Sequence, residues 1–111
     1  MGEPPEQAMV TDDAGTTGPL TTTEAIPVGG GVIFPERGVV ITQPAPGVFL
    51  AFSTTCTHQG CSVRAVAAGT INCFCHGSRF RITDGSVAGG PAPAPLPRHP
   101  ITVTGGSIHL G

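Results

Sequence analysis

The chain is poor in the residue types on which many functions depend. Its 111 residues contain no lysine, tryptophan or tyrosine, and only 11% of them are charged. The lack of lysine argues against a nucleic-acid surface built from a dense basic stripe. The low charge and the hydrophobic fraction of 39% argue against a chain kept open by charge repulsion. No apolar run approaches the roughly 18 residues of a membrane-spanning helix, so we expect no membrane span in this chain.

The few charges are distributed unevenly. Residues 1–36 carry a net charge of −6 and no arginine, whereas residues 37–111 carry +4. Residues 1–24 mix proline, glycine, threonine and acids without apolar periodicity, which predicts a flexible leader or tether. They lack the basic and apolar regions of a signal peptide, so we expect that an exported natural product would need a targeting segment missing here. Residues 25–111 are expected to form one domain.

Glycine and proline are abundant, at 17 and 12 residues, which excludes a helical bundle. Short β-branched runs bounded by turn residues predict a small antiparallel all-β domain. The expected strands are AIPV, GVIF, GVVIT, VFLAF, SVRAV, TINC, FRIT, ITVT and SIHL. The last two flank Gly105 and Gly106, which suits a two-residue hairpin. The segment GGPAPAPLP, residues 89–97, predicts a stiff extended loop that packs beside the cysteine and histidine residues.

Those cysteine and histidine residues are the strongest functional signal. All four cysteines and two of the four histidines fall within 21 residues, in the boxes CTHQGC (56–61) and CFCHGS (73–78). Such a small core is expected to need a metal or a disulfide. The mixed spacing fits structural zinc poorly, a disulfide-only domain leaves the histidines unexplained, and no orienting group supports a thiol catalyst.

The two boxes closely resemble those of Rieske proteins of the cytochrome bc type, in particular small exported actinobacterial-type ones. The resemblance runs from about Ile26 to the C-terminus. It implies a Rieske fold of small antiparallel sheets, with a cluster-binding subdomain of two loops at about residues 54–98. It also implies one 2Fe-2S cluster, in which two Cys bind one iron and two His bind the other. By motif position the ligands would be Cys56, His58, Cys73 and His76.

The resemblance implies further roles around the cluster. Cys61 and Cys75 match the pair that forms a disulfide between the two loops, and the hydroxyl of Ser78 matches a donor to a bridging sulfide. Phe80 stands where the high-potential branch commonly has a tyrosine donor, so we expect a lower reduction potential than in a fully hydrogen-bonded relative. Gln59 replaces a frequent leucine, and Phe74 replaces the usual proline.

The expected function is one-electron transfer by a soluble or tethered carrier rather than an enzyme acting alone. We expect a monomer with an extracytoplasmic location, since disulfides form in oxidising compartments. Its partner would be a redox protein with an acidic face, contacted by Arg64, Arg79 or Arg81. A detached subunit of a bc complex or of a larger oxidoreductase remains an alternative. A dioxygenase-type ferredoxin is a weaker one, because such ferredoxins lack the disulfide cysteines.

Overall fold

The computed structural model describes residues 18–56, 61–74, 77–90 and 92–111, and these residues form an all-β fold with two single-turn 3-10 helices. The strands are β3 (Thr21–Thr22), β4 (Gly30–Phe34), β5 (Val39–Ala45), β6 (Val48–Ser53), β7 (Ala65–Ala67), β8 (Thr70–Asn72), β9 (Arg79–Arg81), β10 (Val87–Gly89), β11 (Ile101–Thr104) and β12 (Ser107–Leu110). The short helices are η2 (Thr23–Ala25) and η3 (Pro35–Arg37). The all-β prediction is confirmed.

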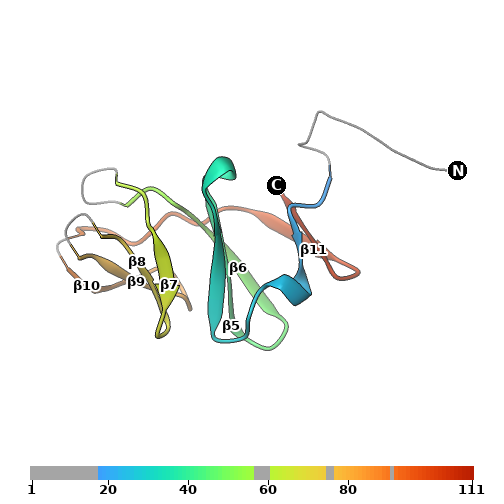
Figure 1. Cartoon of the computed structure of the whole chain (residues 1–111), viewed down its shortest axis with the longest axis horizontal. Coiled ribbons are helices and arrows are strands. Elements are labelled where there is room, and N and C mark those ends of the chain that lie inside the picture. Colours follow the sequence, from blue (N-terminus) through green and yellow to red (C-terminus); the bar gives the residue numbers. More distant parts are fainter. Residues whose placement is uncertain (1–17, 57–60, 75–76, 91) are drawn as a thin grey trace, which may run out of the picture.

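The strands form three small antiparallel sheets arranged in a row (Figure 1). The central sheet has the order β4-β5-β6 and lies between the other two. A four-stranded sheet, β10-β9-β8-β7, lies at one end, and a three-stranded sheet, β11-β12-β3, lies at the other. The expectation of several small sheets rather than one large one is therefore confirmed.

The central sheet divides the hydrophobic core in two. Val40 pairs with Phe52, and both belong to the apolar cluster that extends toward β8 and β9. Their neighbours Ile41 and Ala51 also pair, but they belong to the other cluster, with Ile26 and Ile108. Successive residues of a strand point to opposite faces. A run of apolar residues in β5 therefore supplies both halves of the core.

The C-terminal sheet confirms one prediction and extends the fold toward the N-terminus. β11 and β12 are joined by Gly105 and Gly106, whose φ angles are +56° and +86°, as the predicted hairpin requires. β3 pairs with β12, and the Leu20 amide donates to the Ile108 carbonyl at 2.7 Å. The sheet thus includes residues that we had expected to belong to the leader, and residues 1–17 lie outside the described residues.

One strand prediction was wrong, and β10 was missed in addition to β3. AIPV is not a strand: Ala25 ends η2, and the Gly30 amide closes a turn on the Pro27 carbonyl at 3.2 Å. Ile26 is nevertheless buried, so its apolar character reflects core packing rather than a strand. The strand β10 was missed because VAG is too short to show alternation and is stabilised by pairing with β9.

Among the described residues, no helix is long and apolar enough to cross a membrane.

Candidate metal centre

The first cysteine box forms a loop closed by the backbone at its base. The Cys56 amide donates to the Cys61 carbonyl at 2.6 Å, and Thr55 pairs with Ser62 in an antiparallel bridge. The Val63 amide then donates to the Thr54 carbonyl at 2.7 Å. These bonds continue the end of β6 into the approach to β7, so the first box connects the central sheet with the four-stranded sheet.

The second box has the same closure but lies within one sheet. Asn72 pairs with Arg79 at the end of the β8–β9 ladder, and the Cys73 amide donates to the Ser78 carbonyl at 2.8 Å. Gly77 has a φ of +78°, a backbone conformation that favours glycine. The same spacing therefore separates the two bonded residues in both boxes.

The structure brings the described cysteines of the two boxes together. Cys56 and Cys73 are each 2% exposed and lie in one apolar cluster, against which Cys61 also packs. The other buried members are Val40, Phe52, Val63, Ile71, Phe80, Ile82, Ala92 and Leu96. Such a shell excludes water and lowers the local dielectric constant, which affects the potential of a bound metal group.

Three of the predicted site residues, His58, Cys75 and His76, lie outside the described residues. Within the described part of the chain, no three His, Cys, Asp or Glu side chains gather closely enough to hold a metal ion. Cys61 is disulfide-bonded in the structure. The predicted ligand set and the pairing of Cys61 with Cys75 therefore stay predictions.

A buried hydroxyl tests whether the site fits a bound sulfide-containing group. Ser78 is 1% exposed, and its Oγ has no hydrogen-bond partner among the described residues. A buried hydroxyl without a partner costs about 1–3 kcal/mol. Ser78 follows the loop that Cys73 begins, so an acceptor bound between the loops would satisfy it. The residues present thus fit a group that carries acceptor sulfur.

The proline-rich segment packs against the second box. A Cβ placed on Gly90, whose φ is +90°, would lie 2.5 Å from the Ser78 Cα and 2.8 Å from the Gly77 carbonyl oxygen. Ala92 and Leu96 are buried, and the Ser53 amide donates to the Pro97 carbonyl at 2.9 Å. No strand forms over residues 92–97, as predicted, but Gly89, which the predicted loop included, is the last residue of β10. The close approach of Gly90 had no signal in the sequence beyond the glycine itself.

The three arginines expected to face a partner have different environments. The Arg81 Nη1 donates to the Val87 carbonyl at 2.9 Å and to the Ser86 hydroxyl at 3.2 Å, so Arg81 stabilises the turn between β9 and β10. The Arg79 guanidinium lies against Gly89. Arg64 is exposed and lines a hollow near the first box.

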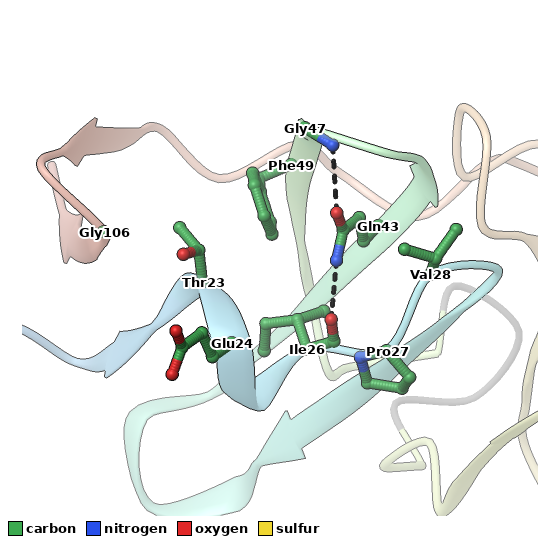
Figure 2. Close-up of a pocket in the computed structure, with 9 residues that line it drawn as sticks. All are labelled: Thr23, Glu24, Ile26, Pro27, Val28, Gln43, Gly47, Phe49 and Gly106. Carbon is green, nitrogen blue, oxygen red and sulfur yellow. Dashed lines mark hydrogen bonds between the residues drawn. The ribbon is translucent and has the colours of Figure 1, made fainter.

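Another hollow, of about 600 Å³, lies away from the boxes, beside η2 and the turn between β5 and β6. Figure 2 shows that the Gln43 side chain crosses it, accepting from the Gly47 amide at 2.9 Å and donating to the Ile26 carbonyl at 2.6 Å. Among the described residues of its lining, Glu24 is the titratable one. The Gln43 contacts tie η2 to the central sheet, and the described lining shows no convergent catalytic groups.

Fold and boxes together define an iron–sulfur domain, and comparison with known proteins identifies it. Residues 19–100 match the model of the Rieske [2Fe-2S] domain, and the chain belongs to this family. Members carry a Rieske-type 2Fe-2S cluster and transfer electrons, often as subunits of oxidoreductase complexes. The membership of the Rieske family that the two boxes implied is thereby confirmed.

Two of the relatives are named as subunits of larger complexes. The chain is 47% identical, over 50% of its length, to 26% of a candidate Rieske subunit of respiratory nitrate reductase in Haloferax mediterranei. It is 37% identical, over 68% of its length, to 41% of the cytochrome b6-f complex iron-sulfur subunit of Chlorobaculum thiosulfatiphilum. The chain thus spans less than half the length of these relatives.

A solved structure matches over nearly its whole length. The plasma membrane Rieske protein PetC3 from Synechocystis PCC 6803 is 33% identical, with a TM-score of 0.67 over 86% of this chain and 99% of that one. The Sphingomonas yanoikuyae B1 ferredoxin superposes with a TM-score of 0.64 at 21% identity, covering 83% of this chain and 94% of that one, which shows the shared fold alone.

Proposed function

We propose that this protein is a one-electron carrier whose 2Fe-2S cluster is held by Cys56 and Cys73 on one iron and by His58 and His76 on the other. When bound, this group accepts and releases one electron. The observation that carries the proposal is the buried Ser78 hydroxyl, which has no hydrogen-bond partner among the described residues. It lies at the base of the second box, and each box is closed by a backbone hydrogen bond between residues five positions apart.

The chain's own residues would set the environment of the electron. Val63, Ile71 and Phe80 exclude water on the core side of Cys56 and Cys73. The Ser78 hydroxyl would donate a hydrogen bond to a sulfur atom and thereby favour the reduced, more negative state. Gly90 holds the proline-rich segment against the Ser78 backbone, which fixes the position of that hydroxyl.

We further propose that Cys61 pairs with Cys75 and links the two loops. Cys61 packs against the shared apolar cluster and is disulfide-bonded, which supports this pairing. This disulfide would close a loop of about 15 residues, which stabilises the folded chain by roughly 3 kcal/mol if the effect comes from the lost entropy of the unfolded chain. It would also favour an oxidising, extracytoplasmic compartment and weigh against an intracellular dioxygenase-type ferredoxin.

The partner would be another redox protein, met by a monomeric carrier tethered at the membrane through its N-terminal side. The relation to a plasma membrane Rieske protein supports this arrangement. We propose that the leader ends before Thr21, rather than at residue 24, because β3 pairs with β12. A subunit of a larger oxidoreductase is the second candidate, favoured by the two relatives named above.

The test is electron paramagnetic resonance of the dithionite-reduced protein, with iron and zinc determined on the same sample. We expect a Rieske-type spectrum and two iron atoms per chain. Cys73→Ser should abolish both. Cys61→Ser, the matched control, should retain the spectrum in fresh protein and lose iron faster on warming. Zinc in place of iron, with no Rieske spectrum, would overturn the proposal.

A further inference from the structure

An aromatic side chain stands in solvent at the cluster end of the molecule. Phe74 follows the buried Cys73, yet it is 68% exposed. The other exposed large apolar residues of the described chain are Val28, Val48 and Val103, which lie on the central and C-terminal parts of the fold. Aromatic residues are enriched at protein interfaces, because they supply a large contact area.

Phe74 borders a hollow that joins the two boxes. The hollow measures about 380 Å³ and is lined by Cys61, Ser62, Arg64 and Phe74. Arg64 and Ser62 are exposed, so the lining combines an aromatic ring, a guanidinium group and a hydroxyl at the surface. Among the described residues no carboxylate forms an ion pair with Arg64, whereas the Arg81 guanidinium is engaged by Ser86 and Val87.

The stretch of sequence that contains both boxes carries no negative side chain. From Gly38 to Thr83 the sequence contains no aspartate or glutamate, and Asp84 is the single acid after Glu36. Of the described residues that line the hollow, Arg64 is the charged one, although the whole chain has a net charge of −2. Arginine pairs with carboxylates through a planar fork of donors.

We propose that Phe74 and Arg64 form the docking surface for a redox protein that presents an apolar contact flanked by carboxylates. This inference rests on the proposed electron-carrier function and adds the chemistry of the partner's face. Phe74 supplies apolar contact area, and Arg64 supplies charge complementarity that raises the rate of encounter. Both side chains line the hollow together with Cys61, the last residue of the first box.

Reduction of ferric cytochrome c by the reduced protein tests this in a stopped-flow instrument. One electron passes from the reduced cluster to the ferric haem iron. No bond is formed or broken, and no proton is transferred. Native cytochrome c has a basic surface, whereas the same protein with succinylated lysines has an acidic one. We expect the rate with the succinylated form to fall as ionic strength rises.

Variants locate the effect on the surface. At low ionic strength, Arg64→Gln should lower the second-order rate constant with succinylated cytochrome c by about threefold and leave or raise the rate with the native form. Phe74→Ala should lower both by about fivefold. The matched controls, Arg37→Gln and Val103→Ala, remove the same charge and a similar exposed apolar group away from the hollow. They should change the rates by less than about 1.5-fold.

The spectrum and reduction potential of each variant separate docking from loading of the cluster. Absence of a Rieske spectrum in the wild-type protein would refute the proposed function itself. With the spectrum and potential intact, equal rates for Arg64→Gln, Arg37→Gln and wild type would overturn the docking surface. So would Phe74-dependent binding to anionic phospholipid vesicles, which indicates a membrane site, or Phe74-dependent dimerisation in sedimentation velocity, which indicates a second copy.

Discussion

The central sheet and the four-stranded sheet that carries the second box hold together in different ways. The strands β4, β5 and β6 have five, seven and six residues, and Val39, Val40 and Ile41 are fully buried. The strands β7 to β10 have three residues each, and their core includes cysteine sulfur and a buried hydroxyl without a partner among the described residues.

The central sheet is stabilised by apolar packing on both of its faces, and we infer that the cluster end depends on the bound cofactor in addition to its apolar core. Strands of three residues are at the short end of the usual range and contribute few ladder bonds. The loops of the boxes are each closed by one described backbone bond at the base. The bound cofactor would therefore supply stability as well as function.

Removal of iron should separate the two regions most strongly. In protein stripped of iron with its disulfide intact, we expect amide exchange in residues 54–64 and 72–80 to accelerate by about a hundredfold or more, because the loops lose their metal bonds. Residues 39–45 should keep most of their protection. Hydrogen exchange followed by mass spectrometry measures both. Equal acceleration of exchange in all three segments would contradict the proposed difference between the cluster end and the central sheet. Reconstitution with iron and sulfide should restore the protection of the two boxes.

Gly90→Ala should be the most damaging of the single substitutions. Its Cβ would collide with the Ser78 backbone, and a non-glycine residue at a φ of +90° is strained in addition. We expect the midpoint of thermal unfolding to fall by about 10–20 °C, from about 3 kcal/mol of destabilisation.

Gly47→Ala is the matched control in the central sheet. Its φ is +80°, but no atom lies within 4 Å of the added Cβ. Backbone strain alone should cost about 1–2 kcal/mol and lower the midpoint by roughly one third to two thirds as much. Equal losses for the two variants would show that packing against Ser78 contributes nothing.

Ser78→Ala should lower the reduction potential with little effect on folding. The hydroxyl has no partner among the described residues, so the variant loses only a donor to the cluster. A loss of about 1.4 kcal/mol for the reduced state corresponds to about 59 mV for one electron. Protein-film voltammetry measures it, and the exposed Ser62→Ala should leave the potential unchanged.

Phe80→Tyr should shift the potential in the opposite direction by a smaller amount. Phe80 is fully buried in the apolar cluster with Cys56 and Cys73, so a new hydroxyl would lie on the cluster side of the core. The expected rise is about 30 mV. Phe49→Tyr, which adds a hydroxyl to the other apolar cluster, should have no effect. A level or lower potential in Phe80→Tyr would refute the assigned donor position.

The smallest effect should come from Asp84, in the turn between β9 and β10. Hydrogen bonds from the Ser86 side chain and amide lower the pKa of Asp84 below that of a free aspartate, with a minor contribution from Arg81. Because the folded pKa lies below the unfolded one, the ionised carboxylate stabilises the fold above about pH 4 and loses this effect as pH falls through the folded pKa.

Asp84→Asn should therefore lower the midpoint of thermal unfolding slightly at pH 6, and the difference from wild type should shrink below about pH 4. A constant difference at both pH values would contradict this.

Local patterns predicted the fold class because they depend on neighbouring residues. The Gly105–Gly106 turn, the β-branched run of β5 and the exclusion of a strand from the proline-rich segment all follow from backbone preferences. AIPV failed because apolar composition does not distinguish a strand from a buried turn. β3 and β10 were missed because both are formed by pairing with a distant or neighbouring strand.

The sequence by itself determined the chemistry that this chain can offer, since the identity and spacing of the cysteine and histidine residues are written in the two boxes. Tertiary structure decided how that chemistry is enclosed. It brings Cys56 and Cys73 into one apolar cluster, seats Gly90 on Ser78, and leaves Phe74 in solvent. These relations join residues far apart in the chain, and only the packing of the sheets against one another specifies them.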